Sequence, residues 1–313
     1  MCGRWAKMSR PNFVEQNISL RDRNAWRVGG VAEFFCTPKT LEEIRAAWSW
    51  ALTQKLPVWI LSGGTNVLVP DGTLRGLTIS LHDYSGVEKV DAPNVESGNP
   101  SSLPLVIHAR AGTPKAEVAK IFLQHRLAPA IFLTGIPGDM GAGVVMNAGI
   151  GEARTPREFC EIVSEIEVLK PDLSLARILA SELRWEYRRS SGWQPGIIVA
   201  VVVRWPMQSD ASVTNAVREQ TRKRVATQPL ELPNCGSVFV NPHGHKAAQL
   251  IEKCGLKGYR IGGACVSKKH ANFIVNDQGA SSSDIWRIIE YVRAEVLKQT
   301  GVQLETEIVK LGE

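Results

Sequence analysis

The 313-residue sequence predicts a mixed fold of helices and strands, divided into two or three domains. Strand and helix patterns alternate between residues 26 and 150, as they do in βαβ units. Residues 133–151, LTGIPGDMGAGVVMNAGIG, hold six glycines and one charged residue, Asp139. Because glycine lets another group approach the backbone closely, this segment is either a ligand-binding loop or a tightly packed core turn.

The first predicted elements are a strand with a turn at residues 26–35 and a helix that begins after Thr40. Thr40 and Glu43 have the spacing of a capping box, which favours a helix start. Pro57 ends this segment, and residues 58–61 predict a short buried strand. The core face of the helix is expected to hold Ile44, Trp48 and Leu52.

The sequence SGGTN follows that strand directly, at residues 62–66. Successive backbone N–H groups in a glycine-rich bend can bind an anion, and Thr65 and Asn66 add further donors. The segment lacks the GK[ST] of a Walker motif and is not the GxGxxG dinucleotide fingerprint. It is therefore either a phosphate cradle or a plain turn.

Residues 77–81 and 105–109 predict two further strands, separated by a polar loop at 84–104. A helix is expected to begin at residues 113–114, with proline at its first position. Its core face holds Val118 and Phe122, and His125 lies at its end. Because both glycine-rich segments fall in one βαβ-type region, we expect them to bind one extended ligand with a phosphate part and an apolar part.

The C-terminal half continues the mixed pattern. Residues 162–169 alternate as a strand does, and the apolar run 197–203 predicts a strand buried on both faces. In a final strand at 302–311, alternation places Gln303, Glu305 and Glu307 on one face. The other predicted elements are a helix with Val213, Val217 and Val225, a strand at 233–242, a helix at 245–254 that Gly255 ends, and a helix capped by Ser281 and Asp284 with the core residues Ile285, Ile288, Val292 and Val296.

Composition and charge restrict the class of protein. The net charge of +6 is mild and spread along the chain, so nucleic-acid binding has little support. The six cysteines form no CxxC pair, which argues against a zinc site or a disulfide framework and fits a reducing cytosol. The longest apolar run is far shorter than the about 20 residues that span a bilayer. We expect a cytoplasmic protein without membrane insertion and without a bound metal.

Seven separate stretches of the chain form an ordered set of motifs: WRVGG, SGGTNVLV, GIPGDMGAGVVMNAG, EYRRSS, GSVFVNP, GLKGYRIGGACVSKKHANFIVN and LETEIVKLG. In order and spacing they resemble the UDP-N-acetylenolpyruvoylglucosamine reductase (MurB) family. Each motif alone is weak, but seven in the same order are specific. The resemblance covers residues 26–312, and the short spacing from Tyr187 to Ser237 is similar to the shorter of the two forms of this family.

The resemblance implies an α+β fold class. It consists of a two-part FAD-binding α/β domain of the vanillyl-alcohol-oxidase (PCMH) type plus an α+β substrate-binding domain. We therefore expect an N-terminal arm at residues 1–20 and the FAD-binding domain at 21–208, with subdomains at about 21–84 and 85–208. The substrate-binding domain, with a C-terminal catalytic strand, is expected at 209–313.

The resemblance also implies the function. NADPH reduces FAD that is bound non-covalently, and the flavin passes a hydride to UDP-N-acetylglucosamine enolpyruvate to give UDP-N-acetylmuramate. Such an enzyme is a UDP-N-acetylmuramate dehydrogenase, a flavoprotein oxidoreductase of peptidoglycan synthesis and hence of cell-wall biogenesis, cell shape and cell division. We expect a monomer with these two small-molecule partners.

Three catalytic residues follow from the resemblance. Arg188 of EYRRSS matches the catalytic arginine of the family, Ser237 of GSVF its proton donor and Glu307 of ETEIV its catalytic carboxylate. Hydride addition to an enol ether conjugated with a carboxylate builds enolate charge, which a bidentate guanidinium can stabilise. A serine is a poor acid, so Ser237 needs a charged neighbour to protonate the adjacent carbon. The residues alone leave Arg189 as an alternative to Arg188, and Glu305 as an alternative to Glu307.

The chain departs from the usual family pattern in places. A small or β-branched pair is common where this chain has Asp139-Met140, and Ala142-Gly143 reverses the usual order. Val309 stands where the family often has arginine.

The same resemblance assigns the binding residues. The expected cofactor-binding residues are Ser62, Gly63, Gly64, Thr65, Asn66, Val67, Gly135, Ile136, Gly138, Gly143 and Asn147, and the expected substrate-binding residues are Tyr187 and Asn241.

Two other functions are compatible with the sequence. One is a flavin oxidase on the same cofactor-binding fold, against which Ser237 and Glu307 in their motifs argue. The other is a non-catalytic nucleotide-binding module. Rapid reoxidation of the flavin by the enolpyruvyl substrate would favour the reductase over the oxidase, and a colourless protein that does not bind FAD would favour the module.

Overall fold

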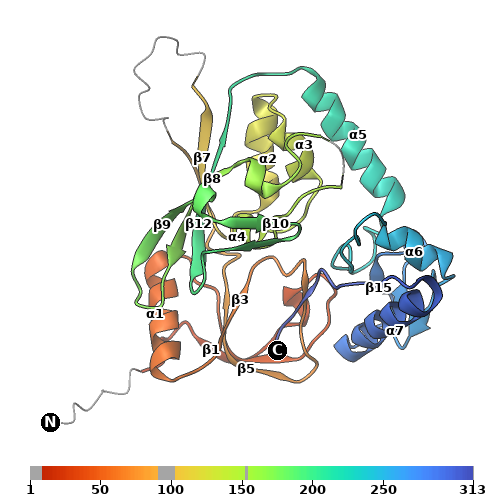
Figure 1. Cartoon of the computed structure of the whole chain (residues 1–313). Helices are drawn as coiled ribbons and strands as arrows, with labels where there is room; N and C mark the ends of the chain where they lie inside the picture. The colour runs from red at the N-terminus through yellow and green to blue at the C-terminus, as the bar shows by residue number, and fades with distance from the viewer. Residues whose placement is uncertain (1–8, 91–102, 152–153, 313) are drawn as a thin grey trace. The chain divides into compact units, whose positions relative to one another are not determined.

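The computed structural model describes residues 9–90, 103–151 and 154–312 of the chain (Figure 1). The first part of the expected arm at 1–20 and most of the expected loop at 84–104 lie outside the described residues. Within the described part, no helix combines the length and the apolar character that crossing a membrane requires.

The chain forms two compact units. The first comprises Met1–Gln16, Glu33–Ser62 and Arg75–Arg218, and the second comprises Asn17–Ala32, Gly63–Leu74 and Glu219–Glu313. The domain boundaries expected from the sequence, at about residues 20 and 208, stay a prediction.

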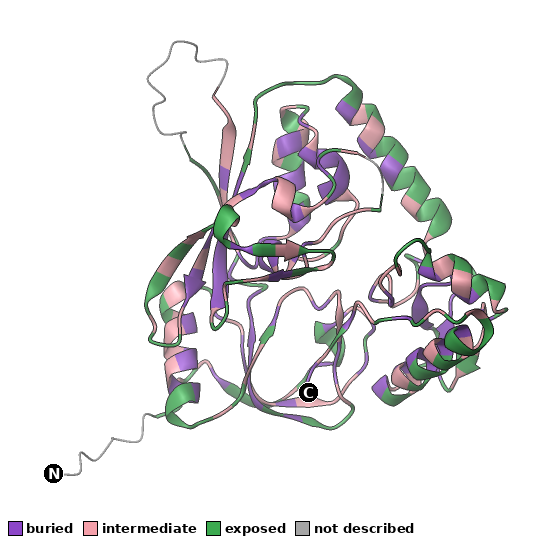
Figure 2. Ribbon diagram, in the orientation of Figure 1, coloured by how far each residue is buried: buried purple, intermediate pink, exposed green. Residues whose placement is uncertain are grey.

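A five-stranded antiparallel sheet is the centre of the first unit. Its middle strand, β12 (Ile197–Trp205), is buried along the apolar run that the sequence singles out, as Figure 2 shows. The expected strands at 105–109 and 162–169 are confirmed as β7 and β8. The strand order is β6 (Val87–Val90), β7 (Leu105–Arg110), β12, β8 (Val163–Leu169) and β9 (Leu175–Leu179).

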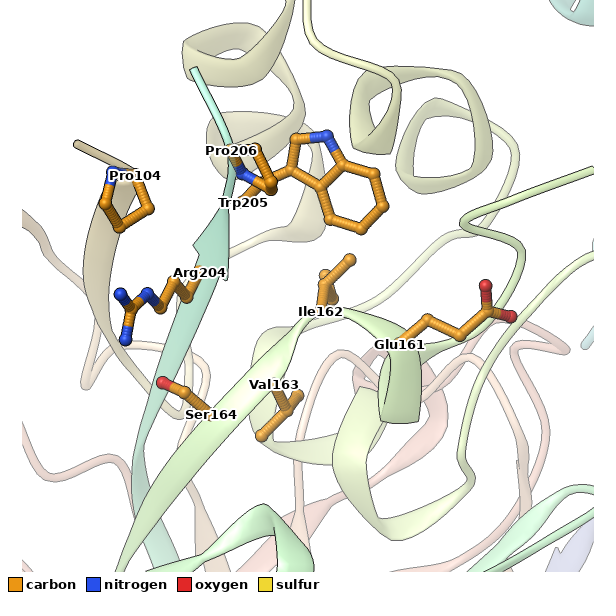
Figure 3. A pocket seen from close by; sticks show the side chains of 8 residues that line it. All are labelled: Pro104, Glu161, Ile162, Val163, Ser164, Arg204, Trp205 and Pro206. Carbon is orange, nitrogen blue, oxygen red and sulfur yellow. The ribbon is translucent and has the colours of Figure 1, made fainter. Parts of the chain in front are cut away.

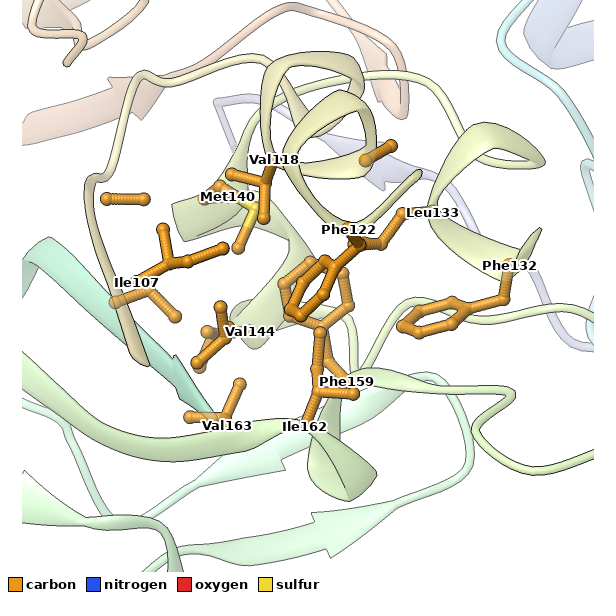
Figure 4. Close-up of a cluster of buried hydrophobic side chains, with 14 of the residues drawn as sticks. Ile107, Val118, Phe122, Phe132, Leu133, Met140, Val144, Phe159, Ile162 and Val163 are labelled. Carbon is orange, nitrogen blue, oxygen red and sulfur yellow. The ribbon is translucent and has the colours of Figure 1, made fainter. Parts of the chain in front are cut away.

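Apolar side chains cover both faces of this sheet. On one face, Phe122, Val144 and Phe159 pack with residues of β7, β8 and β12 (Figure 4). On the other face, Ile44 and Trp48 share a cluster with Ile197 and Val199. The helices on the first face are α2 (Lys115–Gln124), α3 (Pro129–Thr134) and α4 (Met140–Val145), and α1 (Leu41–Thr53) supplies the second.

A second sheet has four strands. Strand β3 (Val58–Leu61) pairs in parallel with β5, and α1 lies between β2 and β3 along the chain. The capping box of Thr40 and Glu43 is confirmed. The order is β1 (Glu15–Ser19), β2 (Val31–Cys36), β5 (Thr73–Ser80) and β3.

The second unit is built around the long helix α7 (Ser282–Thr300). Its predicted capping box, Ser281 with Asp284, is confirmed, and it ends at Gly301 with φ 71°. Its expected core residues Ile285, Ile288, Val292 and Val296 are all buried. The other elements are α6 (Ala247–Lys253), the sheet of β13 (Arg260–Ile261), β14 (Ala264–Val266) and β15 (Ile274–Asn276), and the parallel pair of β4 (Val67–Leu68) with β16 (Val309–Lys310).

One residue of an expected core face and one residue of an expected helix are exposed. Leu52 at the end of α1 is 43% exposed, and Val225 on α5 (Ser212–Thr227) is 57% exposed. Each stands eight positions after a buried residue, Ile44 and Val217 respectively. At 3.6 residues per turn, eight positions leave an offset of about 80° around the helix, which turns both side chains off the buried stripe.

Two expected strands are not continuous strands. Residues 233–242 contain no strand, only an isolated bridge between Phe239 and Thr306. Gly236, with φ 76°, bends the first segment. The second segment, 302–311, is paired only at that bridge and in β16, so strict alternation fails and Thr306, Glu307 and Lys310 are all partly buried.

Candidate active site

The first glycine-rich segment directly follows β3, as expected. Gly64 has φ 63°, and a Cβ atom there would lie 2.2 Å from the carbonyl oxygen of Arg23. Among the described residues, no protein acceptor pairs with the backbone N–H groups of Gly63, Gly64 and Thr65. Three successive donors in a bend of this kind form a concavity for an anion, so the segment fits the diphosphate of a dinucleotide.

The second glycine-rich segment is more helical than the sequence suggests. It contains the end of α3 and the whole of α4, and several of its N–H groups bond within the segment, such as that of Gly143 to the carbonyl of Asp139 at 3.0 Å. A Cβ atom on Gly143 would lie 2.1 Å from the ring of Phe159. Core packing therefore requires glycine at position 143, and Gly138, with φ 87°, forms a bend before α4. Ligand binding by this segment stays a prediction.

Asn147 is a buried residue in the left-handed region, with φ 37°. Its amide donates to Glu158 Oε2 and to the carbonyl oxygen of Glu186, each at 3.1 Å, and its Oδ1 accepts from the N–H of Cys160 at 3.0 Å. The whole amide group is thus engaged by the protein. These bonds make Asn147 a residue that positions neighbouring loops, and a direct cofactor contact stays a prediction.

Asp139, the departure from the family pattern, has a buried carboxylate with three polar neighbours. Ser62 Oγ donates to Asp139 Oδ2 at 2.7 Å, and His82 Nδ1 lies 3.0 Å from the same oxygen. The amine of buried Lys115 donates to the carbonyl of Pro137 at 2.7 Å. Burial lowers the pKa of Lys115 to about 8, and the negative charge of Asp139 opposes this shift.

Arg188 lies in a two-residue turn between β10 (Arg184–Glu186) and β11 (Arg189–Ser191). Its φ of 61° is uncommon for a residue with a side chain, and such strain often accompanies function. Its Nη2 donates to the carbonyl of Gly149 at 2.9 Å, and its guanidinium lies 4.7 Å from the centre of the Tyr187 ring. Arg188 is partly buried and Arg189 is exposed, and the choice of Arg188 as the catalytic arginine stays a prediction.

Ser237 is held in place through hydrogen bonds of the residues next to it in the chain. Gly236 donates its N–H to Asn234 Oδ1, and the N–H of Val238 donates to the carbonyl of Asn272. The side chain of Asn272 bonds to both the N–H and the carbonyl of Phe239, at 3.0 and 2.8 Å. The backbone on both sides of Ser237 is therefore fixed by amide groups.

Glu307 lies on the segment that pairs with the one carrying Ser237. The N–H of Glu307 donates to the carbonyl of Val238 at 2.8 Å, and Asn66 Nδ2 donates to the carbonyl of Glu307 at 3.0 Å. Glu307 is partly buried, whereas the alternative Glu305 is exposed. The second unit thus brings Ser237, Glu307 and Asn66 together.

Asn241 has a structural role that the sequence does not indicate. Its Oδ1 accepts the N–H of Ala247, the first residue of α6, at 3.0 Å. The contact of Asn241 with substrate stays a prediction.

Three polar residues of the site were missed by the sequence analysis: His82, Lys115 and Asn272. None stands in a motif with the residue that it contacts, and the partners are 57, 22 and 33 positions away along the chain. Sequence spacing carries no signal for contacts of this kind.

A pocket of about 460 Å³ lies beside β8 and β12, away from the predicted chemistry (Figure 3). Its lining includes none of the residues expected to bind or catalyse, so we assign it no role in the reaction. The lining residues are Pro104, Glu161, Ile162, Val163, Ser164, Arg204, Trp205 and Pro206.

Comparison with known proteins assigns the family. The model of an FAD binding domain matches residues 32–178, and the model of the UDP-N-acetylenolpyruvoylglucosamine reductase C-terminal domain matches residues 228–311. A UDP-N-acetylenolpyruvoylglucosamine reductase of Synechococcus sp. (strain WH7803) is 36% identical over 301 residues, which are 96% of this chain and 93% of the relative. The chain belongs to the UDP-N-acetylenolpyruvoylglucosamine reductase family.

Other members of the reductase family agree. The member from Nitrosospira multiformis is 37% identical over 94% of this chain and 87% of its own length. The crystal structure of the Thermus caldophilus reductase superposes with a TM-score of 0.74 at 27% identity, over 95% of this chain and 98% of that one. These matches confirm the expected fold class, an FAD-binding domain followed by the family's C-terminal domain, together with the FAD cofactor and the reductase class.

Proposed function

We propose that this reductase converts UDP-N-acetylglucosamine enolpyruvate to UDP-N-acetylmuramate, with NADPH as co-substrate and with Arg188, Ser237 and Glu307 as its catalytic residues. The observation that carries the proposal is the pairing of the Ser237 and Glu307 segments, through the hydrogen bond from Glu307 N–H to Val238. An acid–base reaction needs its groups at neighbouring positions, and the pairing of these two segments, 70 positions apart along the chain, supports this assignment.

FAD is proposed to bind at the two glycine-rich segments. The unpaired N–H groups of Gly63, Gly64 and Thr65 suit its diphosphate, and the segment at 135–147 is expected to contact the rest of the molecule. When bound, FAD supplies the hydride that it receives from NADPH. The proposed ligands are Ser62, Gly63, Gly64, Thr65, Asn66, Val67, Gly135, Ile136, Gly138, Gly143 and Asn147.

Arg188 is proposed to bind the substrate carboxylate. Its guanidinium is always charged and offers two parallel donors, so it stabilises the enolate charge that develops when the double bond is reduced. The strained turn and the bond to Gly149 fix the direction of its side chain. Tyr187, half exposed beside it, is proposed to contact the substrate.

Ser237 and Glu307 are proposed to complete the reaction. Ser237 donates its hydroxyl proton to the carbon next to the one that accepts the hydride, and Glu307, when protonated or hydrogen-bonded, stabilises the charge on the enolate. Fixed placement is what makes a serine competent as an acid, and the backbone on both sides of Ser237 is held by Asn272 and Asn234.

The cellular setting is also part of the proposal. A reductase that uses NADPH and a UDP-sugar for peptidoglycan synthesis is expected in the cytoplasm, and hence to affect cell shape and division. The five cysteines among the described residues are all free thiols, which agrees with a reducing compartment. We propose that the enzyme acts as a monomer.

The proposal is tested by anaerobic stopped-flow absorption of the purified yellow protein. NADPH should bleach the flavin band, and the enolpyruvyl substrate should restore it much faster than oxygen does. In Ser237→Ala, bleaching should keep its rate while restoration by substrate slows by at least about 100-fold. Ser174→Ala, an exposed turn serine, serves as the control. Faster restoration by oxygen than by substrate would favour the flavin oxidase instead.

A further inference from the structure

Asp139 is a buried carboxylate in the segment that is proposed to hold FAD. Its side chain is 2% exposed, and it is the single charged residue of residues 133–151. Burying a carboxylate costs free energy unless it is hydrogen-bonded and its charge is compensated. The carboxylate is therefore expected to have a definite structural purpose in this loop.

Two side chains from other segments share one oxygen of that carboxylate. Ser62 Oγ donates to Oδ2 at 2.7 Å, and His82 Nδ1 lies 3.0 Å from it. A carboxylate only accepts hydrogen bonds, so Nδ1 of His82 carries the hydrogen atom. Bonds to a charged acceptor are about twice as strong as neutral ones, so Asp139 holds both partners firmly.

Lys115 stabilises the same segment through its side chain and its backbone. Lys115 is 4% exposed, and its amine donates to the carbonyl of Pro137, two residues before Asp139. The backbone is paired here as well, because the N–H of Lys115 donates to the carbonyl of Gly138 and that of Met140 to the carbonyl of Thr113. Lys115 thus fixes the peptide groups that lead into Asp139 and supplies the opposite charge.

Ser62 is the first residue of the other glycine-rich segment. It follows β3 directly, and its hydroxyl bond to Asp139 ties the end of β3 to the turn before α4. Building on the proposed FAD site, we propose that Asp139 is a positioning residue for FAD, which acts by holding Ser62 and His82 in fixed positions at the start of the phosphate-binding bend. The contacts of the Asp139 carboxylate among the described residues are with the protein groups Ser62 and His82.

The test is the release of FAD from holoenzyme on serial dilution, followed by the rise in flavin fluorescence. Asp139→Asn keeps the shape of the side chain but removes its charge, and Ser62→Ala removes one donor. Each should release FAD at about tenfold higher protein concentration than wild type, because each loses a charge-assisted bond. Ser62→Thr keeps the hydroxyl and should restore wild-type affinity.

The double variant distinguishes positioning from general damage. If Asp139 acts through Ser62, the combined variant should release FAD about as readily as either single one, since residues in one network are not additive. The visible flavin band should lose its fine structure in the same variants. Asp172→Asn, an exposed aspartate in another turn, should behave as wild type.

Three results would decide the matter. Retention of FAD by Asp139→Asn within twofold of wild type would overturn the positioning role, and so would independent, multiplying effects of the two substitutions. If Asp139→Asn does not fold, His82→Ala still tests the role by removing the other partner of Asp139, because the His82 side chain is 53% exposed and His82 is not itself a proposed FAD ligand. A wild-type protein that holds no FAD would instead refute the proposed function.

Discussion

Asn66 Nδ2 donates a hydrogen bond to the backbone carbonyl of Glu307, 241 positions later in the chain, at 3.0 Å. The N–H of Val309 returns a bond to the carbonyl of Asn66 at 3.0 Å. One side-chain and one backbone hydrogen bond therefore connect the bend that is proposed to bind phosphate with the segment of Glu307, which is proposed for catalysis. A substitution in either segment is therefore expected to alter the position of the other.

Glu307→Gln should lower kcat by roughly 100-fold, because a neutral amide stabilises the enolate charge differently from the carboxyl group. The rate at which NADPH reduces the flavin should not change. Glu305→Gln, on the same segment but exposed, is the matched control and should keep full activity. Equal losses in the two variants would remove Glu307 from the mechanism.

Arg188→Lys should raise KM for the enolpyruvyl substrate and lower kcat, by roughly 100-fold in kcat/KM, because an ammonium group cannot replace the bidentate guanidinium. Arg189→Lys, the neighbour on β11, should leave both constants within twofold. Steady-state kinetics with NADPH in excess would measure both effects. The assignment fails if Arg189→Lys is the more damaged variant.

Gly143→Ala should destabilise the first unit by roughly 1–3 kcal/mol, since the added methyl group meets the Phe159 ring and a packed core resists extra volume. Urea unfolding followed by fluorescence would give this free energy. Gly151→Ala is the control from the same segment, because a Cβ atom there has no neighbour within 4 Å. A stable Gly143→Ala would show that the core yields at Phe159.

Lys115 should make stability depend on pH in the alkaline range. Its pKa is about 8 in the folded protein, below the unfolded value, so its protonated form opposes folding. Between pH 8 and about 10.5 the unfolded chain binds more protons at this lysine than the folded chain does. The free energy of unfolding therefore rises with pH across that window, by at most roughly 3 kcal/mol from this site.

The measurement for Lys115 compares urea unfolding of wild type with Lys115→Met at several pH values. The wild type should gain stability relative to the variant as pH rises from 8 to about 10.5. Lys120→Met, an exposed lysine on the same helix, should follow the wild type. Parallel curves for wild type and Lys115→Met would contradict the depressed pKa.

Local signals in the sequence predicted local structure well. The capping boxes at Thr40 and Ser281 and the apolar run of β12 were confirmed, because each depends on residues close together in the chain. Motif order identified the family and thereby the cofactor. The roles of the individual site residues stay predictions.

Contacts between residues far apart in the chain explain why some expectations were wrong. Residues 233–242 have the pattern of a strand, but Gly236 and the side chain of Asn272 divert the backbone. The contact with Asn272 exists only in the folded chain, so the sequence pattern does not reveal it. The same holds for Asp139, whose partners Ser62 and His82 are 77 and 57 positions away. No periodicity connects such positions.

Trp26 is locked to a segment almost 250 residues later in the chain. Its Nε1 donates to the carbonyl of Ile274 at 2.7 Å, and Asn276 Nδ2 donates to the Trp26 carbonyl at 2.8 Å. During synthesis on the ribosome, the indole of Trp26 stays without these partners until most of the polypeptide has been made. The N-terminal region is therefore expected to need chaperones, and loop closure over this distance is expected to slow the maturation of the enzyme.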